Sequence, residues 1–178
     1  MQTFWARGYE ATSIDDLCES TGLGRSSLYA AFGDKRELYL RALDRYEEDA
    51  AARVSTALKG PLPIHKSIAA FLDKIIDDIA SGPGRRGCFI GNCAAEIPRG
   101  DRGAVNQVRR SLARVEKVFR EALARARDRG EIARTSDVVA LARFFTSGIQ
   151  GLRLVGKANP DRKVLNDIAM VMLGALDL

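Results

Sequence analysis

The stretch SIDDLCESTGLGRSSLYAAFGDK, residues 13–35, predicts two short helices joined by a tight turn. Ser13 is a favourable N-cap for the first helix, and four residues follow it at spacings that place them on one helical face: Ile14, Leu17, Cys18 and Thr21. Gly22 can adopt the left-handed conformation that ends a helix. Beyond this turn, Leu28 and Phe32 lie one helical turn apart and face inward together. The stretch is therefore typical of a helix-turn-helix.

The second of these helices carries an outward face of small and polar residues: Arg25, Ser26, Ser27, Tyr29 and Ala30. In DNA-binding helix-turn-helix units, the second helix lies in the major groove while the first crosses the phosphate backbone. Arg25 can form two hydrogen bonds with one guanine, and the Tyr29 hydroxyl can reach a phosphate. The stretch therefore predicts a DNA-binding unit, although two helices around a glycine also form plain hairpins in all-helical proteins.

Residues 4–43, FWARGYEATSIDDLCESTGLGRSSLYAAFGDKRELYLRAL, resemble the N-terminal domain of the tetracycline-repressor (TetR) family of bacterial transcriptional regulators. The positions that carry the resemblance are Phe4, Gly8, Tyr9, Thr12, Ser13, Leu28, Tyr29, Phe32, Lys35 and Leu38. The resemblance implies a homodimer on double-stranded DNA and a variable C-terminal domain that binds a small molecule. The expected DNA contacts also include the Thr-Ser pair of the family pattern, Thr12 and Ser13. Lys35 is a further expected contact, because it begins the helix over residues 35–58, directly after the helix-turn-helix.

Two features of this region depart from the family pattern. The chain begins in what would be the second half of the first helix, so we expect that helix to be incomplete. Ala30 and Ala31 stand where the family more often has histidine, tyrosine or another polar residue, which leaves fewer side chains to read bases. The basic charge also lies elsewhere, since residues 1–59 hold 8 Lys and Arg against 10 Asp and Glu, whereas residues 60–178 hold 20 against 13. DNA binding must then depend on a few placed groups.

The rest of the chain shows helical periodicity and no alternating strand pattern, which predicts an all-α fold of about nine helices. The expected helices beyond the first three cover residues 35–58, 64–81, 88–97, 101–128, 137–157 and a last segment from 159. Thr135 and Ser136 are the expected cap of the penultimate helix, and Asn159 that of the last. We expect a DNA-binding domain over residues 1–45 and a ligand-binding and dimerisation domain over residues 46–178.

The short helix expected over residues 88–97 mixes apolar bulk with small polar and polarizable groups, a composition typical of small-molecule pockets. An ordinary core helix would explain the same composition equally well. The expected pocket walls are Phe71, Ile75, Phe89, Cys93, Phe119 and Phe144, with Asn92 as a polar anchor. Such walls would select a modest hydrophobic or aromatic molecule.

The last two expected helices carry more apolar surface than one core can cover. Gly148 and Gly151 would let a second helix approach closely, so we expect a two-fold dimer in which these helices form a four-helix bundle. The expected interface residues are Phe145, Gly148, Ile149, Leu152, Ile168, Met172 and Leu176.

The sequence offers no constellation for catalysis, for a metal or for a cofactor. His65 is the single histidine, and the three cysteines lack the paired spacing of a zinc site. No apolar run has the length of a membrane helix and no signal-peptide pattern is present, which predicts a cytoplasmic protein. An enzyme built on a helical bundle is therefore the weakest hypothesis.

Together these patterns predict a DNA-binding transcriptional regulator, a repressor that a small effector releases from a palindromic operator. The alternative is a redox-sensing regulator of the same fold, with Cys88 and Cys93 as its switch. Five residues of continuous helix hold two side chains too far apart for a disulfide unless the helix unwinds locally. Such a sensor thiol would be acidic and accessible.

Overall fold

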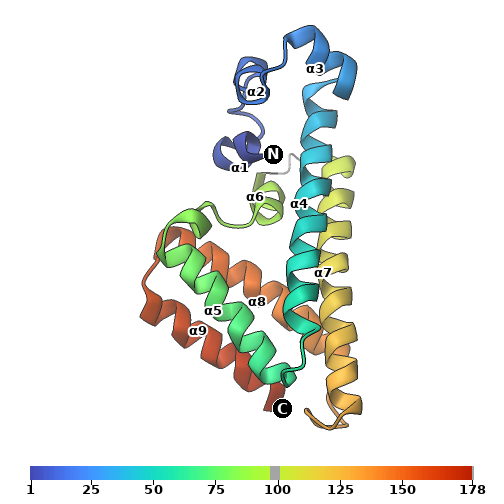
Figure 1. Ribbon diagram of the computed structural model, residues 1–178, viewed down its shortest axis with the longest axis vertical. Helices are drawn as coiled ribbons and strands as arrows, with labels where there is room; N and C mark the ends of the chain where they lie inside the picture. Colours follow the sequence, from blue (N-terminus) through green and yellow to red (C-terminus); the bar gives the residue numbers. More distant parts are fainter. Residues whose placement is uncertain (97–100, 178) are drawn as a thin grey trace. The chain divides into compact units, whose positions relative to one another are not determined.

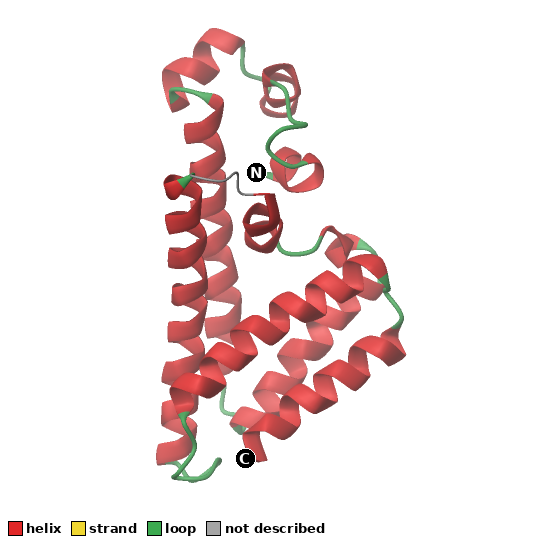
Figure 2. Ribbon diagram, turned by 180° about the vertical axis from the view of Figure 1, so that it is seen from behind, coloured by secondary structure: helices red, strands yellow, loops and turns green. Residues whose placement is uncertain are grey.

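The structure, a computed structural model, describes residues 1–96 and 101–177 of the chain, and this part is helical with no strand (Figures 1 and 2). It contains nine α-helices and two short 3-10 helices. The α-helices are α1 Gln2–Arg7, α2 Ile14–Thr21, α3 Arg25–Phe32, α4 Lys35–Leu58, α5 Ile64–Ala80, α6 Phe89–Glu96, α7 Arg102–Asp128, α8 Val138–Ala158 and α9 Arg162–Gly174, and the 3-10 helices are η1 Pro83–Arg86 and η2 Ala175–Asp177. The all-α prediction is confirmed. The end of the helix expected over residues 88–97 lies outside the described residues.

The helices form two compact units. The first consists of Met1–Asp49 and Phe89–Ser111, and the second of Ala50–Cys88 and Leu112–Leu178. This division differs from the expected boundary between residues 45 and 46, because α6 and the first part of α7 pack with the N-terminal helices. α6 belongs to the first unit because it contributes an aromatic ring to the core of that unit.

That core is a cluster of aromatic side chains from α1, α4 and α6. The Phe4 ring meets the edge of Tyr39 at a centroid distance of 5.1 Å. The Phe89 ring lies 5.6 Å from Tyr39 and 5.8 Å from Tyr46, both in edge-to-face geometry. Phe4 and Phe89 are almost fully buried. Aromatic rings bury large apolar areas, and this geometry adds a favourable quadrupole interaction, so the cluster holds three helices together.

Within the first unit, the helix-turn-helix has the local geometry that its sequence predicts. The Ser13 hydroxyl accepts the Asp16 backbone N–H at 3.0 Å, and the Asp16 carboxylate accepts the Ser13 backbone N–H at 2.8 Å. This reciprocal capping box satisfies two N–H groups that the first helical turn leaves free. Gly22 has φ 70° and donates its N–H to the Cys18 carbonyl at 2.8 Å, which ends α2. Both ends of α2 are thus set by residues of its own stretch.

In the same unit, α4 and α7 lie side by side (Figures 1 and 2) and share a buried polar contact. The carboxylate of Glu47 accepts the Ser111 hydroxyl at 2.7 Å and the Gln107 amide at 3.3 Å. Gln107 also donates to Asp44. Buried polar groups are costly unless they are hydrogen-bonded, so these contacts specify how α4 pairs with α7.

The core of the second unit consists of aliphatic side chains from α5, α8 and α9, with Phe119 of α7 stacked on Phe145 of α8 at 5.7 Å. The first turn of α5 has no cap from its own sequence. Instead, the Glu131 carboxylate accepts the Ile64 backbone N–H at 2.6 Å. A residue 67 positions away therefore caps this helix.

Two caps differ from those expected. Asp137, and not Thr135 or Ser136, is the N-cap of α8, and its carboxylate accepts two backbone N–H groups of the first turn at 2.9 and 3.0 Å. Asp161, and not Asn159, is the N-cap of α9 and accepts one at 2.7 Å. A carboxylate also interacts favourably with the positive end of the helix dipole, which favours aspartate over its neutral neighbours.

Candidate functional site

The exposed face of α3 carries the residues expected to contact DNA. Leu28 points inward and is fully buried. The side chains on the outer face of the helix are all exposed: Arg25, Ser26, Ser27, Tyr29 and Ala30. The placement follows from the helical repeat, because one buried anchor per turn leaves the other positions on the surface. The geometry is that of a recognition helix available to a major groove.

Arg25 does not extend freely from this surface. Its guanidinium donates to both carboxylate oxygens of Asp15 on α2, with three N···O distances of 2.6, 2.6 and 3.0 Å. The hydrogen bonds that Arg25 donates to the Asp15 carboxylate raise the pKa of Arg25, so the guanidinium remains charged. Both side chains are exposed, and exposed ion pairs contribute little to stability. Arg25 can therefore exchange Asp15 for a base or a phosphate.

Two other expected DNA contacts have structural roles. Thr12 is fully buried, and its hydroxyl donates to the Gly8 carbonyl at 2.6 Å, so its assignment as a DNA contact is wrong. Its sequence position beside an exposed cap gave no sign of this burial. Ser13 is exposed, but its hydroxyl belongs to the capping box. The Lys35 ammonium lies 4.4 Å from the centroid of the Tyr9 ring, at the start of α4.

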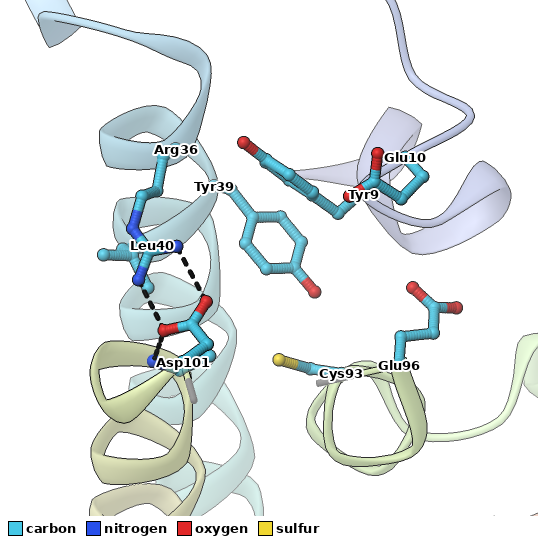
Figure 3. A pocket seen from close by; sticks show the side chains of 9 residues that line it. Tyr9, Glu10, Arg36, Tyr39, Leu40, Cys93, Glu96 and Asp101 are labelled. Carbon is cyan, nitrogen blue, oxygen red and sulfur yellow. Dashed lines mark hydrogen bonds and ion pairs between the residues drawn. The ribbon is translucent and has the colours of Figure 1, made fainter. Parts of the chain in front are cut away.

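The first unit also contains a cavity of about 160 Å³, shown from close by in Figure 3. Residues from the α1–α2 connection, α4, α6 and the start of α7 line it: Tyr9, Glu10, Arg36, Tyr39, Leu40, Cys93, Glu96, Asp101 and Ala104. Tyr39, Cys93 and Ala104 are buried and form its floor, whereas Glu10 and Glu96 are exposed. The cavity therefore combines an apolar floor with carboxylates near solvent.

On one side of the cavity, Arg36 and Asp101 form a two-pronged ion pair with N···O distances of 2.6 and 2.7 Å (Figure 3). Asp101 also accepts the Ala104 backbone N–H at 2.9 Å, which caps α7. The hydrogen bonds from Arg36, and then that from Ala104, lower the pKa of Asp101 to about 2. A Cβ atom on Gly103 would lie 2.7 Å from an Arg36 guanidinium nitrogen, so a larger residue there would make the end of the Arg36 side chain shift.

Cys93 lies on the floor of the cavity, where burial raises the pKa of its thiol. The Tyr39 hydroxyl hydrogen-bonds to the sulfur, and burial raises the pKa of Tyr39 as well. A buried, neutral thiol is the opposite of the acidic and accessible group that a redox sensor needs. Cys88 is buried too. The geometry thus does not favour the two-cysteine switch.

The cavity shares only Cys93 with the pocket expected from the sequence. Ile75 and Phe119 pack within the core of the second unit, and Phe89 belongs to the aromatic cluster of the first. Phe144 is 40% exposed and therefore lines no interior wall. The remaining two expected residues, Phe71 and Asn92, are half-buried and do not line this cavity. Apolar periodicity identifies buried residues, but a buried residue surrounded by others has no empty space beside it.

The cavity residues that sequence reasoning missed are mainly Tyr9, Glu10, Arg36, Tyr39 and Asp101. They come from three segments that no motif connects. One local signal was present, since an exposed arginine and a capping aspartate mark the starts of α4 and α7. That signal does not say that the two helix starts adjoin.

The expected dimer interface also needs correction. Phe145, Ile149, Leu152, Met172 and Leu176 are buried inside the second unit. Ile168 is partly buried against the same core, and a Met172 side chain covers Gly148. The five buried residues are already covered by their own chain and offer little surface to a second copy, whereas Gly148 and Ile168 are only partly buried.

A different face of α8 and α9 is open. On α8, the exposed residues that recur once per helical turn are Ala140, Phe144, Ser147, Gly151, Leu154 and Ala158, none of which is charged. Leu154 is 69% exposed, and on α9 Met170 and Val171 are 68% and 75% exposed. By length and composition alone, α8 is apolar enough to span a membrane. Its apolar residues are explained by one face that packs in the core and by the uncharged stripe on the opposite face.

Comparisons with known proteins agree along the whole chain. Residues 1–42 match the family described as bacterial regulatory proteins, tetR family, and residues 65–172 match the tetracyclin repressor-like C-terminal domain. The chain is 31% identical to the uncharacterized HTH-type transcriptional regulator YezE of Bacillus subtilis, over 99% of this chain and 92% of that protein. It is 34% identical to the HTH-type transcriptional repressor ComR of Escherichia coli, over 95% of this chain and 81% of that protein.

A solved structure extends the comparison to a DNA complex. It contains a cysteine mutant of the TetR family transcriptional regulator CifR bound to a 26-bp double-stranded operator. The two chains superpose with a TM-score of 0.86 at 26% sequence identity, over 98% of this chain and 91% of that one.

Proposed function

Because the chain belongs to the TetR family of bacterial DNA-binding transcriptional regulators, we propose that it acts as a homodimeric repressor of a palindromic operator. The observation that carries the proposal is the capped helix-turn-helix whose second helix exposes Arg25, Ser26, Ser27 and Tyr29. The family is one of regulators and not of enzymes. A repressor of this kind works in the cytoplasm, where its operator lies.

The proposed DNA contact depends on a few groups, because the first unit has no excess of basic residues. Arg25 is the base-reading side chain, because its guanidinium can form two hydrogen bonds with one guanine. Tyr29 and the two serines contact phosphates and set the orientation of the helix. Lys35 adds charge at the start of α4, from where its ammonium can leave the Tyr9 ring for the backbone.

The uncharged stripe of α8, together with Met170 and Val171 on α9, supports the proposed homodimer. Large exposed apolar surfaces on soluble proteins mark sites of association. A two-fold axis beside this stripe would pair α8 and α9 with their copies, and a palindromic operator follows from that symmetry. The proposed interface residues are thus Phe144, Leu154, Met170 and Val171, with Gly151 allowing a close approach.

The proposed effector acts by differential binding. A ligand that binds another conformation more tightly than the DNA-bound conformation lowers operator affinity by the ratio of its affinities for the two conformations. The operator lowers ligand affinity by the same factor. The effector is a small molecule with a ring or other modest apolar body. The cavity of the first unit supports this, because its lining includes residues of α4 and of the connection that leads into α2.

The test is selection of genomic fragments by the protein, followed by titration of the enriched site. We expect a palindrome with half-sites about one helical turn or a multiple of it apart. Arg25→Ala should lower affinity for that site roughly ten- to a hundredfold and relax its base preference. Lys35→Ala should weaken all sequences alike and reduce the salt dependence. Arg45→Ala, which removes an exposed arginine of α4 outside the helix-turn-helix, is the matched control. A selection that enriches no palindrome contradicts the proposal.

A further inference from the structure

We propose that the cavity of the first unit binds a small organic ammonium ion that carries one ring or a group of similar size. The inference rests on the proposed function, because it names the chemical class of the effector and the residues that select it. It moves the effector site from the apolar pocket expected in the C-terminal part to a place beside the helix-turn-helix.

The size of the cavity limits the ligand to a small molecule. An apolar cavity of about 150 Å³ is large enough to bind benzene. The present cavity measures about 160 Å³, so it accepts one ring with a short substituent and excludes fused or extended ring systems. Its floor of Tyr39, Cys93 and Ala104 is buried and suits the apolar part of such a ligand.

The charge of the lining selects a cation. Three carboxylates and one guanidinium line the cavity, and Asp101 is already neutralised by Arg36 at 2.6 and 2.7 Å. Within residues 1–96 and 101–177, Glu10 and Glu96 form no ion pair. Both carboxylates line this one cavity, where they repel an anion and gain by pairing with an ammonium group.

The ring faces of the cavity favour the same class. Tyr9 and Tyr39 contribute rings to its lining, and their centroids lie 4.9 Å apart (Figure 3). A cation gains by lying over the face of a tyrosine ring. One face of Tyr9 already holds the Lys35 ammonium, 4.4 Å from the ring centroid, so a ligand cation would have to use the remaining ring surface of the cavity. A ligand ring can contact Tyr39 on the cavity floor while its ammonium group reaches the carboxylates.

The arrangement of acidic groups favours an organic cation over a metal ion. In the part of the chain that the structure describes, no three His, Cys, Asp or Glu side chains converge closely enough to hold a metal. The Cys93 thiol is neutral and hydrogen-bonded to Tyr39, so it is no ready metal ligand. Glu10 and Glu96 therefore provide charge and hydrogen-bond acceptors without a coordination sphere.

Ligand binding at this site would reach the helix-turn-helix through the segment that precedes α2. Gly8 has φ 81°, and a Cβ at that position would lie 3.0 and 3.1 Å from the two Glu96 carboxylate oxygens. Glu96 thus lies directly against the end of α1. An ammonium ion that draws Glu96 and Glu10 together changes this contact. Thr12, which anchors the same connection through the Gly8 carbonyl, carries the change toward the N-cap of α2.

The experiment compares three probes of one shape and different charge: benzylamine, benzyl alcohol and benzoate. Isothermal titration of the protein should show benzylamine binding at least tenfold more tightly than benzyl alcohol, and benzoate binding most weakly. Glu96→Gln and Glu10→Gln should remove this preference for the amine while leaving the thermal unfolding midpoint unchanged. Glu121→Gln removes one exposed carboxylate of the second unit and serves as the matched control, which should keep the preference.

The outcomes separate this inference from the proposed function. Equal binding of benzylamine and benzyl alcohol, or an amine preference that survives Glu96→Gln, overturns the site even if the protein still binds its operator. If benzylamine binds through Glu96 and weakens operator binding in proportion, both proposals are supported. If it binds through Glu96 and leaves operator affinity unchanged, the site stands and effector release through it is wrong.

Discussion

Asp15 of α2 and Arg25 of α3 are bound to each other, with one guanidinium nitrogen 2.6 Å from both carboxylate oxygens. The pair joins the first helix of the helix-turn-helix to the first residue of the recognition helix. When no DNA is bound, it holds in place the side chain of α3 that we propose reads bases. Operator binding through Arg25 must therefore replace a carboxylate by a base or a phosphate.

Asp15→Asn should strengthen operator binding, because Arg25 then has no carboxylate to leave and one negative charge near the DNA is removed. We expect a gain of a few-fold at low salt, consistent with the small energies of exposed ion pairs. Fluorescence anisotropy of the operator duplex at two salt concentrations measures it. Glu19→Gln removes one exposed charge from the same helix without touching Arg25 and should give a smaller gain. Weaker binding by Asp15→Asn would mean that Asp15 orients Arg25 for DNA.

Charges placed on the uncharged stripe should break the proposed homodimer. Leu154→Asp and Val171→Asp would each bury a carboxylate in the interface, which costs several kcal/mol. Sedimentation velocity should show monomers for both variants, with the helical circular dichroism retained, because both side chains are exposed within one chain. Leu62→Asp makes the same change at a 50% exposed leucine outside α8 and α9 and should remain dimeric. Dimers from both stripe variants would place the interface elsewhere.

Removal of the cap of α2 should destabilise the first unit. Ser13→Ala loses the hydroxyl that accepts the Asp16 backbone N–H, and such a change costs about 1 kcal/mol. Urea unfolding should show this loss in the free energy of unfolding. Ser27→Ala, at an exposed position inside α3, should cost much less, since alanine is a better helix former than serine. Equal losses would show that the capping box contributes nothing specific.

The ion pair of Asp101 with Arg36 predicts a pH dependence of stability. The pKa of Asp101 is about 2 in the folded protein, below its ordinary value of 3.8. Its contribution is therefore fully present above about pH 4 and is lost as the pH falls through about 2. The difference in free energy of unfolding between the wild type and Asp101→Asn should shrink over this range. In an Arg36→Gln background the same difference should be smaller at neutral pH, and an unchanged difference would assign the effect to the cap of α7 alone.

Local features of the chain explain why the helices were predictable. Ser13, Gly22 and Leu28 act within a few residues of their helices, so the capping box, the αL turn and the buried position of α3 all follow from sequence spacing, and Phe32 is half-buried on the same side. The start of α4 follows equally from Asp34, whose carboxylate accepts the Glu37 backbone N–H at 2.8 Å. Interactions of this range require no knowledge of the rest of the fold.

The sequence by itself therefore determined the helix order, the helix-turn-helix and the outward face of its second helix. Only the tertiary structure decided which apolar face of α8 is core, because Phe144 and Phe145 are adjacent and either could have faced inward. It also decided the place of the cavity, since Tyr9, Tyr39 and Cys93 come from three segments. The physical reason is that helical periodicity identifies faces, whereas empty space and buried pairs arise from how distant faces fit together.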